Sequence, residues 1–135
     1  MHTEPDSELD ELARQVIGAA IEVHRHHKAG YPEAIYRESM VLELGLRGLR
    51  VEQEVPVAVT YKGHSVGQGR IDLLVGGRLV VELKTVDAIS DAHVAQVVTY
   101  LKATGQPLGL IINVRTAAVR GSAVRRVAYS ERSEQ

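Results

Sequence analysis

Residues 70–85 read Arg-Ile-Asp-Leu-Leu-Val-Gly-Gly-Arg-Leu-Val-Val-Glu-Leu-Lys-Thr, two apolar runs separated by Gly76-Gly77. A Gly-Gly pair between two such runs predicts a β-hairpin with a two-residue turn. Side chains alternate across a strand, so Ile71 and Leu73 are expected to share one face. The second run is apolar on both faces at residues 79–81, which is typical of a central strand that is covered on both sides. The stretch therefore predicts the middle of a sheet.

Charged residues interrupt this otherwise apolar hairpin. Glu82 and Lys84 share one face of the second strand, as Arg70 and Asp72 do on the first, and counting back from the turn places Asp72 approximately alongside Glu82. Burying such charges costs several kcal/mol per ion unless each ion is paired or binds a metal. The pattern therefore predicts either a functional metal site or a structural ion pair, Glu82 with Lys84 or Asp72 with Arg70.

Two carboxylates beside an ammonium group suit a divalent cation and a phosphate. Mg²⁺ prefers oxygen ligands, commonly one or two carboxylates with water and substrate phosphate completing its shell. The ion lowers the pKa of a bound water and offsets charge that builds on phosphorus, while a Lys can orient that water. The functional alternative is therefore phosphate chemistry with Mg²⁺ or Mn²⁺ as cofactor.

Two helices are predicted before the strands. Residues 7–27 have apolar side chains at helical spacing after Ser7, a residue type that can cap a first turn. Pro32 suits the first turn of a second helix that ends near Gly48, because its missing N–H would be unpaired there anyway. The apolar face predicted for this second helix consists of Ile35, Ser39, Leu42 and Leu46.

The remaining elements predict an α/β fold, a mixed sheet with helices packed on it, in the order α-α-β-β-β-α-β-β. The period changes to two over residues 50–61, and Pro56 places that strand at an edge. A third helix is predicted from the Ser90 cap to Thr104. The other strands are predicted at residues 66–75, 78–85, 108–114 and 124–129.

Composition restricts the class of protein. The chain has 135 residues, 44% hydrophobic and 24% charged, which predicts one globular domain at 7–129 with flexible tails at 1–6 and 130–135. It has no Cys, so disulfides, thiolate zinc sites and cysteine nucleophiles are excluded. Its apolar runs are too short to cross a bilayer and its first residues do not resemble a secretory signal. A cytoplasmic location without a membrane partner is expected.

The net charge of −1 conceals an uneven distribution. Residues 1–54 hold 6 basic and 11 acidic residues, whereas residues 55–135 hold 10 basic and 6 acidic ones. A local basic surface would suit a phosphate-rich partner such as nucleic acid. Because phosphate contacts supply most of the affinity for nucleic acid, a small chain of near-zero charge is expected to act as a homodimer or with a partner protein.

The helices carry further polar candidates. His93, Gln96 and Tyr100 form one stripe on the third helix, which could face the carboxylates or simply be a solvated face. His24 and His27 lie one turn apart without an evident third ligand, so ordinary surface or packing roles are expected for them. Acidic residues on the second helix that could complete a metal site, or merely solubilise it, are Glu33, Glu38 and Glu43.

In order and spacing, Asp72, Glu82-Leu83-Lys84, Gln96 and Tyr100 resemble the Asp…Glu-x-Lys…Gln-x-x-x-Tyr signature of the PD-(D/E)XK nuclease superfamily. The segment Gly30-Tyr31-Pro32-Glu33-Ala34-Ile35-Tyr36 is similar to the motif of the GxxExxY protein family, a branch of that superfamily. The similarity covers roughly residues 12–128. It implies a restriction-endonuclease-like core and a Mg²⁺-dependent phosphodiesterase site.

The resemblance also implies roles for individual residues. Lys84 would serve the attacking water, and Glu38 competes with Glu33 as the acid from the early helix. The implied catalytic residues are Asp72, Glu82, Lys84, Gln96, Tyr100 and Glu33. The implied metal ligands are Asp72, Glu82, Glu33 and the backbone carbonyl of Leu83. Substrate contacts are expected from Arg70, His93 and Tyr36.

The expected function is therefore hydrolysis of DNA phosphodiesters, with RNA as a second possible substrate. Two alternatives stay open from the sequence. One is a catalytically silent nucleic-acid-binding or scaffold domain of the same fold, and the other is a nuclease that is active only with a partner. Metal binding through Asp72 and Glu82 separates a catalytic site from a structural ion pair.

Overall fold

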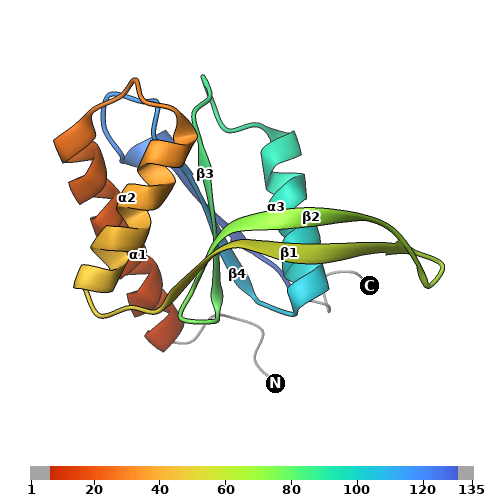
Figure 1. Cartoon of the computed structure of the whole chain (residues 1–135). Helices are drawn as coiled ribbons and strands as arrows, with labels where there is room; N and C mark the ends of the chain where they lie inside the picture. The colour runs from red at the N-terminus through yellow and green to blue at the C-terminus, as the bar shows by residue number, and fades with distance from the viewer. Residues whose placement is uncertain (1–6, 131–135) are drawn as a thin grey trace.

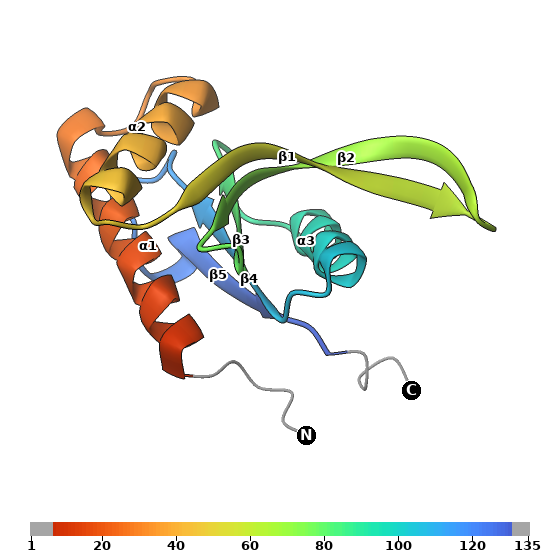
Figure 2. The ribbon, with the colours of Figure 1, turned by 60° about the horizontal axis from the view of Figure 1, so that its bottom comes forward.

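Five strands form one mixed sheet, with α1 and α2 packed on one face and α3 on the other (Figures 1 and 2). The computed structural model describes residues 7–130, so the predicted tails, apart from Ser130, lie outside the described residues. The helices are α1 (Ser7–His27), α2 (Glu33–Leu46) and α3 (Asp91–Thr104), with a 3₁₀ turn at Gly121–Ala123. The strands are β1 (Val51–Tyr61), β2 (His64–Val75), β3 (Leu79–Lys84), β4 (Leu108–Asn113) and β5 (Val124–Ala128).

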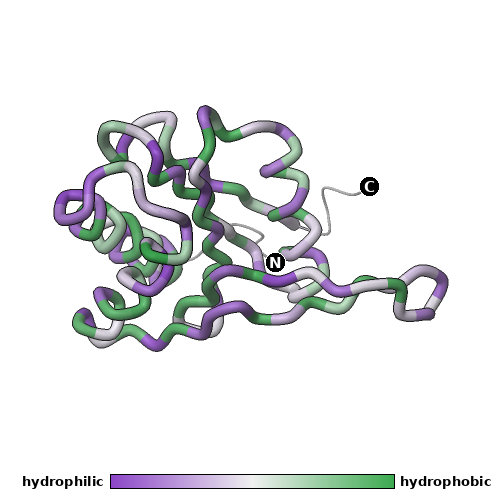
Figure 3. The backbone as a smooth tube through the Cα atoms, turned by 45° about the horizontal axis from the view of Figure 1, so that its top comes forward, coloured by the Kyte–Doolittle hydropathy of each residue, from purple (hydrophilic) through white to green (hydrophobic). Residues whose placement is uncertain are grey.

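The strands lie in the sheet in their sequence order, β1-β2-β3-β4-β5. β3 and β4 are parallel and α3 connects them, whereas the other neighbours are antiparallel. The prediction of a central third strand is confirmed, and β1 is the edge strand that Pro56 predicts. Hydrophobic residues run along the strands in the middle of the molecule (Figure 3). Within residues 7–130, none of the helices has both the length and the apolar character that crossing a bilayer requires.

The turn between β2 and β3 is longer than predicted. Val75 pairs with Leu79, so three residues link the strands, and Gly76 and Gly77 adopt the positive φ values, 62° and 71°, that suit glycine. Continuing this register beyond the pair Leu73–Val81 places Asp72 opposite Glu82, whereas a two-residue turn would have placed it one position away. The extra turn residue therefore aligns the two carboxylates.

The prediction that Ile71 and Leu73 share a face is wrong. Leu73 packs with α1 and α2, whereas Ile71 packs with α3 on the other side of the sheet. Between these residues the β1 partner strand contains Glu54, whose φ of 54° is left-handed. The change of face therefore coincides with a backbone irregularity in the neighbouring strand.

The predicted apolar face of α2 is also wrong. Leu42 and Leu46 are 67% and 74% exposed, and Ile35 is exposed as well. The residues that α2 buries are Tyr36, Met40 and Leu44. Tyr36 is also anchored by its hydroxyl, which donates to the Lys28 carbonyl in the α1–α2 loop, and it packs in the core with Met40 and Leu44. Pro32 is the N-cap rather than the first helical residue.

Gly109→Ala is expected to lower the free energy of unfolding by about 1–3 kcal/mol, because a Cβ on this β4 residue would lie 2.7 Å from Cγ1 of Val97 on α3. Gly45→Ala is the matched control, since Gly45 lies in α2 and a Cβ added there would meet no atom within 4 Å. This control is expected to raise the stability by about 0.5–1 kcal/mol. Urea denaturation measures the free energy of unfolding of both variants. Equal stability of the two would contradict close packing of α3 on β4.

Candidate active site

The β2–β3 ladder opens at the charged residues. The Asp72 N–H donates to Glu82 Oε2 at 2.8 Å, and the Leu83 N–H donates to Asp72 Oδ2 at 2.8 Å. Each carboxylate therefore takes the place of a backbone carbonyl on the neighbouring strand. Asp72 lies beside Glu82, which counting from the predicted two-residue turn gives to within one position, and backbone N–H groups fix both side chains.

Lys84 extends from the end of β3 toward α3. Its Nζ lies 3.1 Å from Gln96 Oε1 and 4.0 Å from Glu82 Oε1, and only 19% of the side chain is exposed. The closer partner is the neutral amide, so Gln96 fixes the ammonium group without neutralising it. This geometry places Lys84 next to the carboxylates while its charge is only partly satisfied by the contact with Glu82.

Glu33, the first residue of α2, completes the cluster. Its carboxyl group hydrogen-bonds the Asp72 side chain, and burial, followed by repulsion from Asp72, raises the pKa of Glu33 to about 7. Lys84 and Arg37 act in the opposite direction. Glu38, the competing candidate, is exposed on the same helix. The structure thus brings Glu33 to Asp72 from an element about 40 residues earlier in the chain.

Glu82 is the most perturbed carboxyl group of the cluster. Burial, and then the Asp72 charge, raise the pKa of Glu82 to about 8, while the Asp72 N–H and the Lys84 ammonium offset part of the rise. Only 3% of the residue is exposed. Three carboxyl groups and one ammonium therefore share a poorly solvated spot, where either a proton or an added cation relieves their repulsion.

The donor set suits a hard divalent cation. Carboxylate oxygens of Asp72, Glu82 and Glu33 are the ligands that Mg²⁺ and Mn²⁺ prefer. The Leu83 carbonyl points toward β2, because N–H and C=O of one strand residue project to the same side and this N–H reaches Asp72. Within residues 7–130, the acidic and His side chains form no ready-made group of three metal ligands.

Tyr100 and Arg70 lie at the border of the cluster. The Tyr100 hydroxyl accepts a hydrogen bond from the Arg70 backbone N–H at 3.3 Å, and its ring occupies the space where a Cβ on Gly69 would lie. Tyr100 therefore joins α3 to β2 just before Asp72. The Arg70 side chain is 62% exposed and pairs with Glu54 at 3.4 Å rather than with Asp72.

Two other residues that were predicted to contact substrate make contacts within the protein instead. Tyr36 has no exposed surface, so it cannot touch a substrate in this structure, and its role is to anchor the α1–α2 loop that precedes Glu33. His93 belongs to the cap of α3, since its Nδ1 accepts from the Ser90 N–H at 3.0 Å. Both residues position elements that carry site residues.

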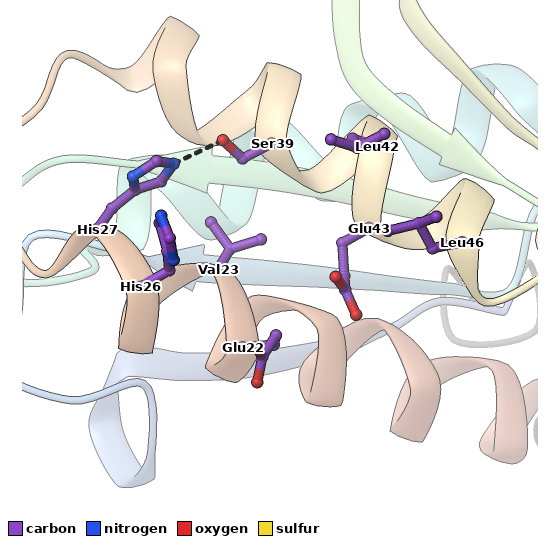
Figure 4. Close-up of a pocket in the computed structure, with 8 residues that line it drawn as sticks. All are labelled: Glu22, Val23, His26, His27, Ser39, Leu42, Glu43 and Leu46. Carbon is purple, nitrogen blue, oxygen red and sulfur yellow. Dashed lines mark hydrogen bonds between the residues drawn. The ribbon is translucent and has the colours of Figure 1, made fainter.

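His24 and His27 have ordinary structural contacts, in line with the surface or packing roles expected for them. His24 Nε2 lies 2.8 Å from the Thr116 carbonyl oxygen, and His27 Nε2 lies 2.7 Å from Ser39 Oγ. His27 borders a hollow of about 250 Å³ between α1 and α2 (Figure 4). No member of the carboxylate cluster lines this hollow.

Sequence reasoning missed two residues that support the site. Arg37 bonds Glu54 at 3.0 Å and lies 4.0 Å from Glu33, so it connects the acid of α2 to β1. Its i, i+4 spacing from Glu33 was the available signal. Asn113 ends the wholly buried β4 and clamps the loop after β3, because its side chain bonds both the N–H and the C=O of Val86. A polar residue at the end of an apolar strand was the signal there.

An α/β sheet that presents an Asp and a Glu-x-Lys pair on neighbouring strands, with a third acid from a helix, has the layout of a nuclease core. A family model for the PD-(D/E)XK nuclease superfamily matches residues 10–127, and the chain belongs to this superfamily. The sheet and its flanking helices accordingly form a restriction-endonuclease-like fold. No curated protein and no solved structure gave a match. The family supports a nuclease-like function with nucleic acid as its substrate class.

Proposed function

We propose that this protein is a divalent-metal-dependent nuclease that hydrolyses phosphodiester bonds of DNA, with RNA as the second candidate substrate. One observation carries the proposal: the carboxyl groups of Glu33, Asp72 and Glu82 meet beside Lys84 where the β2–β3 ladder opens. Membership of the GxxExxY branch is part of the proposal and rests on the segment Gly30–Tyr36. A homodimer or a partner protein, and a cytoplasmic setting, stay predictions.

Asp72, Glu82, Glu33 and the Leu83 carbonyl would hold Mg²⁺ or Mn²⁺. When bound, such an ion lowers the pKa of a water molecule and offsets charge on the phosphate. The residues around this metal site would have separate roles. Lys84, held by Gln96, orients the attacking water and stabilises negative charge as it develops on the phosphate oxygens.

The remaining residues act by position. Tyr100 bonds the backbone next to Asp72 and keeps α3 against β2, so that Gln96 stays within reach of Lys84. Arg37 draws Glu33 toward the cluster from the neighbouring turn of α2. These contacts hold the reacting groups in place before the substrate binds, which is the usual source of electrostatic catalysis.

The test combines cleavage with metal binding. Labelled single-stranded and double-stranded DNA and RNA are incubated with the protein and Mg²⁺, Mn²⁺ or a chelator. Calorimetry then compares the binding of Mn²⁺ by Asp72→Asn with that by Asp91→Asn, an exposed Asp in the first turn of α3. We expect cleavage only with metal, and a loss of Mn²⁺ binding only in Asp72→Asn. No cleavage of any substrate together with Mn²⁺ binding unaffected by Asp72→Asn would favour a structural ion pair and a silent domain.

Glu33→Gln is expected to lower the cleavage rate by about 10–100-fold, because the neutral amide removes a charge from the metal site. Glu38→Gln is the matched control on the same helix and is expected to leave the rate unchanged. The comparison is made at saturating Mg²⁺ and again across a Mg²⁺ titration. A larger loss in Glu38→Gln would assign the helix acid to Glu38.

A further inference from the structure

The hairpin of β1 and β2 extends well beyond the rest of the sheet as a two-stranded arm (Figures 1 and 2). β2 pairs with β3 over Leu73–Val75, whereas its pairing with β1 continues out to His64. We call residues 56–70 the arm. Toward its tip the arm exposes Val59, Tyr61 and Val66, so the ribbon leaves the core and carries its own apolar side chains into solvent.

The arm has a charge composition unlike the rest of the chain. It contains no Asp or Glu, although acidic residues slightly outnumber basic ones in the whole protein. Its tip carries Lys62 and His64, whereas Arg70 at its base is paired with Glu54 of β1, so Lys62 is the main charge that the arm presents. Gln68, Ser65 and Thr60 add neutral hydrogen-bonding groups along the exposed ribbon. A ribbon of this composition is complementary to a polyanion and carries no group that repels one.

The arm is also continuous with the candidate active site. Arg70 at its base is two residues from Asp72 on the same strand, and Tyr100 fixes this junction through the Arg70 N–H. From Asp72 to His64 the strand reaches about 26 Å at roughly 3.3 Å per residue. This length corresponds to about eight base pairs at 3.4 Å each. A nucleic acid that bound at the carboxylates and followed the arm would contact it over this length.

We propose that the arm lies in the major groove of double-stranded DNA, which makes duplex DNA the substrate class of this nuclease; this inference rests on the proposed function. The major groove of B-DNA is about 12 Å wide and admits a two-stranded β-ribbon. The corresponding groove of an RNA duplex is too deep and narrow for side chains to read, and a single strand has no groove. The shape of the arm thus fits the duplex, and the absence of Asp and Glu from residues 56–70 is compatible with a polyanionic partner.

The turn at the tip allows a charge change without a change of fold. Lys62 and Gly63 have φ values of 52° and 81°, the two left-handed positions of a type I′ turn. Asn-Gly and Asp-Gly are the preferred pairs in this turn. Lys62→Asn therefore removes the charge, and Lys62→Asp reverses it, while both keep the turn. The matched control is Arg14→Glu on α1, which makes the same reversal at a side chain that is 76% exposed.

Fluorescence anisotropy measures binding to one labelled sequence as duplex DNA, single-stranded DNA and duplex RNA, in chelator so that no cleavage occurs. Lys62→Asp is expected to weaken duplex DNA binding by roughly tenfold at low salt, and Lys62→Asn is expected to reduce the salt slope by about one. Arg14→Glu is expected to change binding less than twofold. Wild-type protein is expected to bind duplex DNA at least tenfold more tightly than the other two nucleic acids.

Three results would overturn the proposal. The first is equal binding of duplex DNA by Lys62→Asp and Arg14→Glu, and the second is equal affinity of the wild type for the three nucleic acids. The third is a dimer that Lys62→Asp converts to a monomer in sedimentation, which would assign the arm to a protein interface. Because no step of this experiment depends on hydrolysis, a protein that binds through the arm without cutting would refute the proposed catalysis and leave the arm assignment intact.

Discussion

Lys84→Ala is expected to lower the rate of metal-dependent DNA cleavage by at least about 10²–10³-fold. The Lys84 ammonium lies in the carboxylate cluster, 4.0 Å from Glu82 Oε1. It is held there by Gln96, whose Oε1 lies 3.1 Å from Lys84 Nζ. Removal of the ammonium leaves the attacking water without an orienting group and the developing oxyanion without compensation. The measurement is single-turnover cleavage of labelled duplex DNA at saturating Mg²⁺, where binding no longer limits the rate.

Lys102→Ala is the matched control for this experiment, because Lys102 is an exposed lysine in the last turn of α3, the helix that carries Gln96. It is expected to cleave at the wild-type rate. Denaturation curves of both variants show whether the fold is intact, and the Lys84 Nζ takes no part in the strand ladder. A Lys84→Ala protein that cuts within threefold of the wild type would remove Lys84 from the mechanism.

The free energy of unfolding of the metal-free protein is expected to fall as the pH rises from about 5 to 8. An unfolded Glu82 loses its proton near pH 4.5, whereas burial and Asp72 raise the pKa of the folded Glu82 to about 8. Between these values the unfolded state has released the proton that the folded state keeps, so stability falls by about 1.4 kcal/mol per pH unit for this group. Glu33 contributes less, because a third of its side chain is exposed and solvent screens its charge.

Glu82→Gln is expected to flatten this dependence, so that the variant is more stable than the wild type at pH 8 and similar to it at pH 5. Glu38→Gln is the control and is expected to keep the wild-type slope. Saturating Mg²⁺ is expected to restore stability to the wild type at pH 8, since the ion favours the ionised carboxylates. Urea denaturation across the pH range measures all three, and a flat wild-type profile would show that Glu82 is ionised in the folded protein without metal.

The local patterns of the sequence were enough to predict the order of the elements and the hairpin that holds the acids. The Gly76-Gly77 pair and the apolar run after it depend on turn chemistry and strand burial, which act over a few residues. The same holds for the cap at Ser90, which begins α3 where expected. Asp72 beside Glu82 follows from the hairpin alone, once the turn is known.

The orientations of side chains that local sequence patterns did not predict involve contacts between distant segments. α2 buries Tyr36, whose hydroxyl bonds the Lys28 carbonyl of the preceding loop, and exposes Leu42 although the spacing of Leu42 suits a buried face. Ile71 and Leu73 lie on opposite faces beside the left-handed Glu54 of β1. Neither arrangement is visible in the hydrophobic periodicity of a single segment, because both involve contacts with a segment elsewhere in the chain.

The carboxylates of Asp72 and Glu82 have a second role as rungs of the β2–β3 ladder, since each accepts a backbone N–H at 2.8 Å. A descendant that no longer cuts nucleic acid would still need an acceptor oxygen at both positions to keep β2 and β3 paired there. Asn or Gln supplies that oxygen without the charge, so selection for folding alone keeps the acceptors and not the acidity. The Lys84 ammonium accepts no N–H of the ladder, so the pairing of the strands does not retain it once the chemistry is lost.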